Sequence, residues 1–171
     1  MPVFKRFLTL FSLVSALVLS TGCVAADLVV SDKLVIKYTE PKLIAHTSNS
    51  LILKYNNWWF SHDVVDGERM YPGMDLSDQL PVFIRSIFDP KIRKSLAPEL
   101  SLLSEEQAKA FGITDGNVKR EKRGTAELMA VYDEKSKRGD IYVIEERMIQ
   151  HVEISGNAAE FAELMGNIKE R

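Results

Sequence analysis

Hydrophobic and polar residues follow a two-residue period over much of the first third of this chain. Residues 33–39 alternate and include β-branched side chains, which predicts a strand. Residues 50–55, rich in Leu and Ile, predict a second strand, and residues 58–63 predict a third. The Asn56-Asn57 pair between the last two strands tolerates positive φ at both positions, which favours a tight hairpin turn.

The middle of the chain has the period of a helix. Between Leu80 and Phe88 the apolar residues recur on one helical face. Ser104-Glu105-Glu106-Gln107 has the pattern of a capping box, and Gly112 stands where a helix would stop, so residues 105–111 predict a short helix. Residues 66–75 contain two glycines and a proline, and they predict a loop.

The last third returns to strands and ends in a helix. Three strands are predicted over residues 125–132, 140–146 and 148–154, with a charged turn before the second. Asn157, with Glu160 three residues later, predicts the start of a helix that runs to about Lys169. Its apolar side chains share one face at helical spacing: Phe161, Leu164, Met165 and Ile168.

This order of elements predicts an α+β domain. We expect a mostly antiparallel β-sheet of about six strands, covered by helices, with an amphipathic C-terminal helix. Residues 33–171 would form this single domain, which is long enough for one core and too short for two. Residues 1–22 predict a signal peptide, and residues 23–32 predict a short tether.

The amino-terminal segment has the features of a secretion signal. Lys5 and Arg6 supply positive charge, and the 13 residues from Phe7 to Leu19 are almost all apolar. That length fits the apolar region of a signal peptide and falls short of the roughly 20 residues needed to span a bilayer. The small residues Ser20, Thr21 and Gly22 follow, as a signal peptidase requires before its cleavage site.

Two cleavage sites compete in this segment. Thr21-Gly22-Cys23 resembles the bacterial lipoprotein signal, the lipobox, in which Leu and two small residues precede a cysteine that is acylated; here Ser20 occupies the position of that Leu. In the alternative, ordinary signal peptidase cuts after Ala26, because Val24-Ala25-Ala26 fits its small-x-small requirement. The second route would release a soluble periplasmic or secreted domain.

Cys23 is the only cysteine of the chain. A free thiol is unusual in the oxidising compartments outside the cytoplasm, and acylation explains its presence at this position. We therefore predict lipidation of Cys23, with diacylglycerol and fatty acyl chains such as palmitate, and a membrane partner held through this anchor. Because Val24 is not the Asp associated with inner-membrane retention, the resemblance implies the outer membrane, facing the periplasm, of a Gram-negative cell envelope.

The carboxy-terminal pattern resembles a second family. Strands, mid-chain helices, a strand meander and a final helix of the form Phe-x-x-apolar-apolar-x-x-Ile-Lys, here Phe161 to Lys169, are similar to the PsbP/DcrB-type fold. The resemblance covers the order of elements over about 120 residues and reaches motif level only near the carboxy terminus. It implies a non-catalytic accessory or binding domain, with an envelope protein as the expected partner, and it transfers no functional residues.

Composition narrows the function classes. The formal net charge is −2, and it becomes about −4 once Lys5 and Arg6 leave with the signal peptide. An acidic, mixed surface does not favour nucleic acid, which binds basic faces. No nucleophile elbow and no glycine-rich phosphate loop are present, so we expect no cofactor and no catalytic residues.

One local cluster of possible metal ligands is present. His62, Asp63 and Glu68, with Asp66, are the basis of the alternative prediction, a periplasmic metal-assisted enzyme that uses the segment from His62 to Glu68. His151 alternates with its neighbours on a predicted strand, which is typical of a surface or hydrogen-bonded histidine.

Aromatic and basic residues suggest two possible binding surfaces. Trp58 and Trp59 lie on opposite faces of a predicted strand, and whichever is exposed could form a binding surface with Tyr71. Residues 119–123, Lys-Arg-Glu-Lys-Arg, could contact anionic lipid head groups or form a solvated edge strand whose charges block unwanted pairing.

Overall fold

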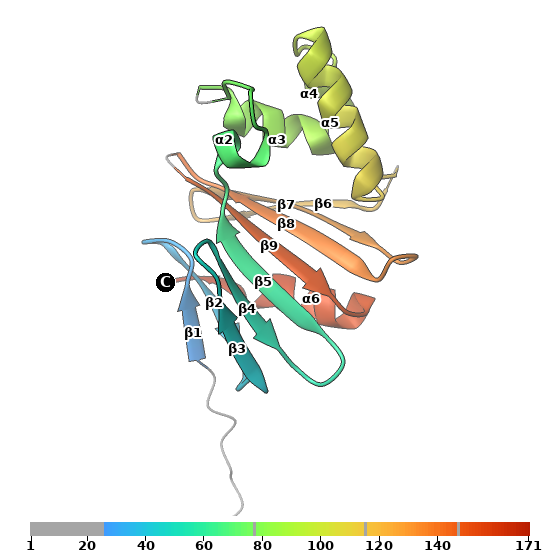
Figure 1. Ribbon diagram of the computed structural model, residues 1–171. Coiled ribbons are helices and arrows are strands. Elements are labelled where there is room, and N and C mark those ends of the chain that lie inside the picture. The colour runs from blue at the N-terminus through green and yellow to red at the C-terminus, as the bar shows by residue number, and fades with distance from the viewer. Residues whose placement is uncertain (1–25, 77, 115, 147) are drawn as a thin grey trace, which may run out of the picture.

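The computed structural model describes residues 26–171, except residues 77, 115 and 147. The described chain has two antiparallel sheets, of seven and three strands, together with helices (Figure 1), which confirms the predicted α+β class. The expected count of about six strands was too low. The strands beyond the six that were counted are short or lack an apolar alternation: β1 (Ala26–Val29), β3 (Leu43–His46), β6 (Val118–Arg123) and β10 (Ile168–Glu170).

The other elements follow the predicted order closely. The remaining strands are β2 (Leu34–Tyr38), β4 (Ser50–Lys54), β5 (Trp59–Val64), β7 (Ala126–Asp133), β8 (Arg138–Ile144) and β9 (Ile149–Ser155). The helices are α2 (Gly67–Met70), α3 (Leu80–Phe88), α4 (Pro90–Arg93), α5 (Pro98–Ala110) and α6 (Ala158–Asn167). Among the described residues, no helix is both long enough and apolar enough to cross a membrane.

The seven-stranded sheet has the order β3-β4-β5-β9-β8-β7-β6, and all of its pairs are antiparallel. The β4–β5 hairpin turns at Asn56-Asn57, where the Tyr55 amide donates to the Trp58 carbonyl at 2.9 Å, so the predicted hairpin is confirmed. The basic segment 119–123 belongs to β6, at one edge of the sheet, as one of its two interpretations predicted.

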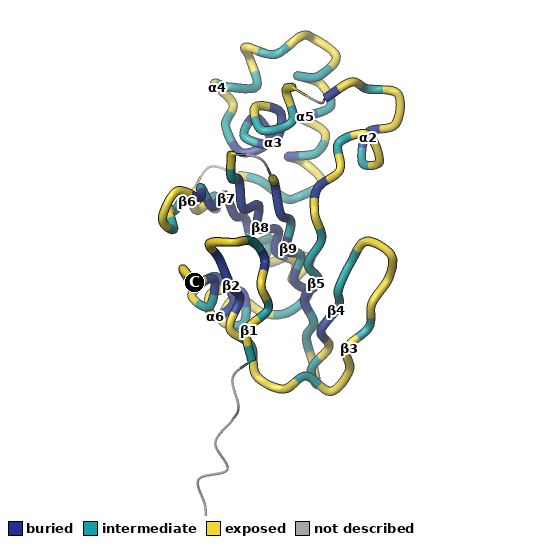
Figure 2. Tube along the Cα trace, turned by 90° about the vertical axis from the view of Figure 1, so that its left-hand side faces the viewer, coloured by how far each residue is buried: buried dark blue, intermediate teal, exposed yellow. Residues whose placement is uncertain are grey.

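One face of the large sheet packs on the small sheet and α6. Because side chains alternate along each strand, Phe60, Ile141 and Ile154 point to this face, where Phe161 of α6 and Ile36 of β2 cover them. The small sheet has the order β1-β2-β10. Figure 2 shows the resulting buried layer between α6, β2 and the strands β7 to β9.

The opposite face of the large sheet is only partly covered. Met129, Tyr142 and Ile149 are buried there beneath α3, whose residues Phe83 and Ile87 are themselves fully buried. Helices α2 to α5 gather over one end of the strands (Figure 1). Within the part of the chain that the structure describes, no helix covers the other end of this face, on β3 to β5 and the adjoining parts of β8 and β9.

Two helix boundaries differ from the sequence prediction. Helix α5 begins at Pro98, and Ser104 lies inside it, buried, with its hydroxyl 2.7 Å from that of Ser86, so the predicted capping box at Ser104 is wrong. The predicted helix end near Gly112 is confirmed, since Gly112 adopts φ +64° one residue after the C-cap. The predicted loop 66–75 includes the single turn of α2.

The final helix starts as predicted and ends earlier. Asn157 accepts from the backbone of Glu160 while the Glu160 carboxylate accepts from the Asn157 amide, so the capping box is confirmed. The chain leaves the helix at Ile168, which is buried but extended, and residues 168–170 pair with β2 instead of continuing the helix. Sheet pairing thus prevails over helical periodicity in the last turn.

The predicted tether is shorter than expected. Residues 26–29 form β1, which pairs with β2 in the register Asp27↔Lys37, so the folded domain includes Ala26 and does not begin at Lys33. The predicted signal peptide, Cys23 and the first part of the tether lie outside the described residues.

Candidate functional site

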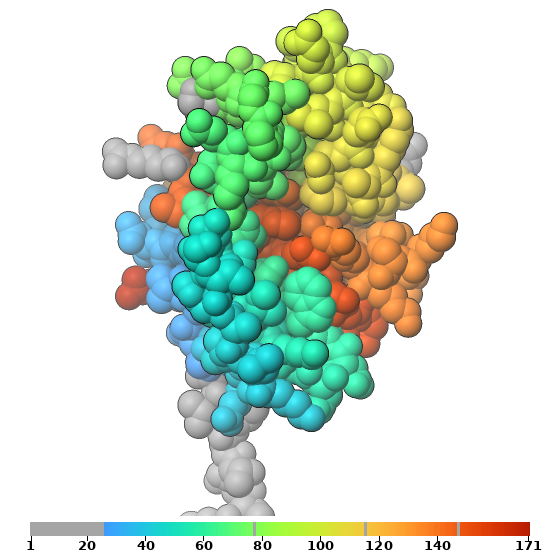
Figure 3. Space-filling view, viewed as in Figure 1, coloured from blue at the N-terminus to red at the C-terminus, as the bar shows by residue number. Residues whose placement is uncertain are grey.

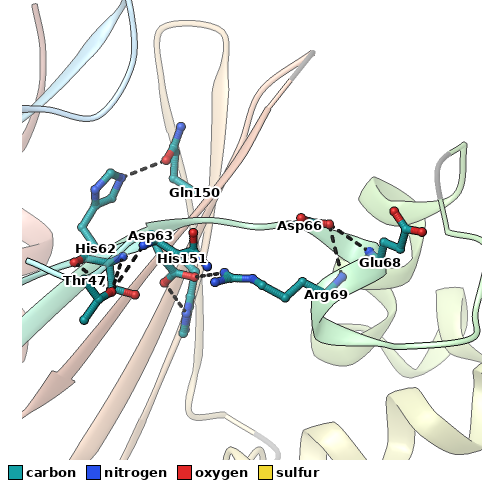
Figure 4. Close-up of polar contacts among 10 residues, drawn as sticks. Thr47, His62, Asp63, Asp66, Glu68, Arg69, Gln150 and His151 are labelled. Atoms are coloured by element: carbon teal, nitrogen blue, oxygen red, sulfur yellow. Dashed lines mark hydrogen bonds and ion pairs between the residues drawn. The ribbon is translucent and has the colours of Figure 1, made fainter.

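The predicted metal ligands do not converge. His62 and Asp63 are neighbours on β5, and successive strand residues face opposite sides of the sheet. The His62 Nε2 atom lies 2.8 Å from Oε1 of the buried Gln150, on the face away from Asp63 (Figure 4). Burial lowers the pKa of His62, and the hydrogen bond to Gln150 offsets only part of that effect.

Glu68 lies farther away, exposed on α2 (Figure 4). Asp66 caps that helix, since its Oδ1 accepts from the amides of Glu68 and Arg69 at 3.1 and 3.2 Å. Within the described ranges, no group of three or more His, Cys, Asp or Glu side chains is placed to hold a metal ion. The structure therefore does not bring the three candidate ligands into one site.

A different polar group is present on the partly open face, where three strands meet. His151 of β9 lies between Asp63, its register partner on β5, and Asp140 of β8, which is diagonal to it because Tyr142 is the β8 residue directly opposite. Its Nε2 is 3.0 Å from Asp140 Oδ1, and its Nδ1 is 3.4 Å from Asp63 Oδ1. Arg69 reaches Asp63 from α2 at 3.6 Å. We call Asp63, His151 and Asp140 the Asp-His-Asp row.

The row is a buried charged arrangement. Asp140 is 3% exposed, and the His151 side chain is 12% exposed. Burial alone lowers the pKa of His151, but hydrogen bonds and charge interactions with Asp140 and Asp63 outweigh it and raise that pKa to about 9. His151 is therefore an imidazolium at neutral pH, and it compensates two carboxylates that would otherwise repel one another.

The geometry favours a structural role for this histidine. A catalytic general base needs one free ring nitrogen, whereas both nitrogens of His151 face carboxylates. The Tyr142 ring stacks on the imidazole at 4.5 Å between centroids and does not present its hydroxyl to it. The row therefore links β5, β9 and β8 by side-chain interactions in addition to their backbone hydrogen bonds.

This arrangement makes stability depend on pH above neutrality. The pKa of His151 in the folded protein lies above the unfolded value of about 6.5, so its contribution is complete below about pH 6.5 and is lost as the pH rises through about 9. We expect the free energy of unfolding to fall by on the order of 3 kcal/mol over this range. Urea unfolding at a series of pH values measures it.

Two histidine variants separate this effect from general alkaline destabilisation. His151→Gln should flatten the decline between pH 6.5 and 9, whereas His46→Gln, on the exposed strand β3, should leave it unchanged. A wild-type curve that is level across that interval would contradict a charged His151.

A groove of about 400 Å³ adjoins the Asp-His-Asp row. It lies between the β3–β4 turn and α2, and its lining includes Ser50, Asp63, Asp66 and Arg69. The Arg69 guanidinium, 40% exposed, spans the groove towards Asp63. The charged side chains of the groove thus pair with each other or cap α2.

The predicted aromatic surface does not form as expected. Tyr71 is buried, and its ring centroid lies 4.9 Å from that of Phe83. Burial raises the pKa of Tyr71 to about 12. Trp59 begins strand β5, and Tyr71 follows beyond the other end of that strand. The six residues of β5 span roughly 20 Å. Trp58 packs on the core face and stacks on Tyr55 at 4.2 Å, while Trp59 points to the opposite face. Tyr71 therefore cannot share a surface with the tryptophans.

Trp59 instead belongs to the uncovered end of the large sheet. The register Leu43↔Lys54↔Trp59 places these three side chains in one row across β3, β4 and β5. The same face also carries Ser61 of β5, next to Trp59. Beyond it, Arg138 of β8 and Glu153 of β9 form an ion pair at 2.6 Å. Figure 3 shows this area below the helices, and β9 is visible between the helices and the strands β3 to β5. We call this uncovered end of the large sheet the open sheet face.

Comparison with protein-family models, with curated proteins and with solved structures finds no match to this chain. The fold and site therefore define a class only by their own geometry: an α+β domain of two antiparallel sheets, with a buried Asp-His-Asp row and an open sheet face. The resemblances to the lipobox and to the PsbP/DcrB-type fold stay predictions.

Proposed function

We propose that this chain is an exported envelope lipoprotein, in which acyl chains on Cys23 hold a non-catalytic binding or accessory domain at a membrane. The observation that carries the proposal is the place of the sole cysteine. It follows an apolar signal-like segment directly, and only Val24 and Ala25 separate it from strand β1. A cysteine at this point of the sequence is suited to anchoring, because it precedes the first strand of the domain by only three positions.

The interior of the domain supports the accessory role. Its most buried charged group, the Asp-His-Asp row, has its imidazole nitrogens directed at carboxylates. The open sheet face, around Ser61 and the Arg138–Glu153 ion pair, offers a surface where a protein partner could bind.

We extend the proposal to the carboxy-terminal helix. Helix α6 buries Phe161, Leu164 and Met165, while Ala162 and Glu163 are exposed, a distribution suited to an amphipathic helix of the PsbP/DcrB type. In a Gram-negative host the anchored domain would reside on the outer membrane and face the periplasm, since Val24 follows the cysteine.

Replacement of the cysteine tests the proposal. In cells that produce Cys23→Ser, we expect the protein to move from the membrane fraction to the soluble fraction, because the acyl chains supply about 0.8 kcal/mol per buried methylene. Fractionation followed by mass spectrometry of the amino-terminal peptide measures both location and acylation.

A matched variant supplies the control. Ser20→Leu restores the usual lipobox residue and should leave the protein at the membrane with equal or more complete processing. A wild-type protein that is soluble and begins at Asp27 would identify cleavage after Ala26 and contradict the proposal.

A further inference from the structure

We propose that the end of the domain next to Cys23 is a membrane-docking surface, on which Leu43, Ile44 and Trp59, flanked by Lys42 and Lys54, lie in the head-group region of the phospholipid bilayer. This inference rests on the proposed lipid anchor. It adds an orientation: the strand ends face the lipid, and helices α2 to α5 face away from it.

The length of the anchor brings this end of the domain to the membrane. Three peptide steps join Cys23 to Ala26, and at 3.8 Å per step they span roughly 11 Å at most. A glycerolipid on Cys23 has its acyl chains in the hydrocarbon core and its glycerol at the interface. The first residue of β1 is therefore held within roughly 11 Å of the bilayer interface.

Side-chain contacts place the β4–β5 hairpin beside that first residue. Ala26 pairs with Tyr38 in the small sheet. The Tyr55 hydroxyl, at the end of β4, donates to the Thr39 carbonyl at 3.1 Å, and Trp58 stacks on Tyr55. The start of β1, the end of β2 and the hairpin thus occupy one end of the molecule, the lower end in Figure 1.

This end exposes apolar side chains on a sheet edge. Leu43 and Ile44 of β3 are 55% and 54% exposed, and they point to opposite faces of the edge strand. The other edge, β6, instead exposes Lys119, Arg120 and Lys122. Charged edges resist unwanted pairing in water, whereas an apolar edge needs a cover. The bilayer interface supplies that cover for β3 alone, because β3 starts at the anchored end.

The polar residues around Leu43 suit a head-group environment. The Lys42 amide donates to the Lys54 carbonyl at 2.8 Å, so the two lysines flank Leu43. In the described part of the chain, neither lysine forms an ion pair, whereas nearby Asp27 is paired with Lys37 at 3.2 Å. Tryptophan and lysine beside exposed aliphatic residues are the usual composition at a membrane interface.

Tryptophan fluorescence tests the orientation directly, because the two tryptophans of the chain, Trp58 and Trp59, lie at the β4–β5 hairpin. Full-length protein purified from membranes is reconstituted in phosphatidylethanolamine–phosphatidylglycerol vesicles that contain a phosphatidylcholine brominated in its acyl chains. We expect the bromines to quench Trp59 in a Trp58→Phe variant. Adding Leu43→Glu and Ile44→Glu should reduce that quenching at least about twofold, since both side chains would then resist burial.

A tryptophan at the far end is the control. Leu102 of α5 is 60% exposed, so Leu102→Trp in a chain that also carries Trp58→Phe and Trp59→Phe should float with the vesicles and remain unquenched. Quenching of that residue equal to the quenching of Trp59 would overturn the orientation.

Flotation and quenching separate the two proposals. Protein that floats with Trp59 unquenched overturns docking and leaves the anchor in place. Protein that does not float overturns both. If unquenched protein also cross-links between two copies through a cysteine introduced at Ala45, the β3 edge pairs with a second copy of the chain, and docking to lipid is wrong.

Discussion

Replacing Asp140 with alanine is expected to destabilise the domain by about 3–5 kcal/mol, because it leaves a buried imidazolium without its nearer carboxylate. Asp140 is 3% exposed, and it accepts from His151 at 3.0 Å. The remaining partner, Asp63, is more distant at 3.4 Å and also interacts with Arg69. The measurement is urea unfolding at pH 7, followed by circular dichroism.

Asp27→Ala is the matched control for this experiment. Asp27 pairs with Lys37 on the surface, where the two side chains are 47% and 49% exposed, and such pairs contribute at most about 1 kcal/mol. Removing an aspartate carboxylate should therefore lower the free energy of unfolding much more at the buried position 140 than at the exposed position 27. If Asp140→Ala cost no more than Asp27→Ala, the Asp-His-Asp row would not be an essential link between the strands.

The Asp140 variant also tests the electrostatic account of His151. With one carboxylate removed, the pKa of His151 should fall, because burial continues to lower it and the strongest opposing hydrogen bond is lost. Stability of the variant should therefore vary less between pH 6.5 and 9 than stability of the wild type.

A single methyl group at Gly139 is expected to cost about 3 kcal/mol, at the upper end of the usual range for overpacking. Gly139 lies on β8 beneath helix α6, opposite Ile154. A Cβ at this position would lie 2.5 Å from Cδ2 of Phe161 and 2.9 Å from Cγ2 of Ile154. Neither neighbour is the free end of a flexible chain, so Gly139→Ala must displace the helix or the sheet.

Gly166→Ala should instead increase the free energy of unfolding. Gly166 lies near the end of α6, it is exposed, and a Cβ there would have no atom within 4 Å. Alanine in a helix is favoured over glycine by about 0.5–1 kcal/mol. Both variants are compared by their urea midpoints.

Phe161→Leu provides a further check, because a smaller side chain opens space above Gly139. In the Gly139→Ala background it should recover part of the lost stability, although Phe161→Leu alone removes buried area. Strictly additive effects of the two substitutions would show that the added methyl group does not act by displacing Phe161.

Several elements could be derived from local chemistry alone. The Asn56-Asn57 hairpin, the helix from Leu80 to Phe88 and the capping box of Asn157 depend on turn conformation, periodicity and capping within a few residues, and the structure confirms all three. The sole cysteine behind an apolar segment is likewise a local pattern, and it carries the prediction of a lipid anchor.

The sequence-based predictions are wrong where pairing with a distant part of the chain outweighs the local pattern. Ile168 has the right spacing for a helix, yet pairing with Ile36 of β2 draws it into β10. Ser104 has the sequence of a cap, yet helix α5 continues through it because Ser86 of α3 supplies its hydrogen bond. No short window of sequence contains these partners, so no local rule could have predicted them.

The candidate sites also show the difference between what local sequence predicts and what long-range contacts decide. Adjacent His62 and Asp63 suggested a metal site, but strand alternation alone sends them to opposite faces. Asp140 and His151 lie on the consecutive strands β8 and β9, but Asp63 is far from both in sequence, and only the strand order β5-β9-β8 brings it next to His151. A signal of this row was present in His151 on a strand next to apolar residues, but its partners depend on strand order.

The sequence by itself determined the export-like start, the isolation of Cys23, the α+β class and most helix and strand positions, because each depends on composition or short-range periodicity. Only the tertiary structure decided which sheet face is covered and that the β4–β5 hairpin lies at the same end of the domain as Ala26. It also revealed that β3 is an apolar edge. Those properties depend on the order of strands, which arises from contacts between residues far apart in the chain.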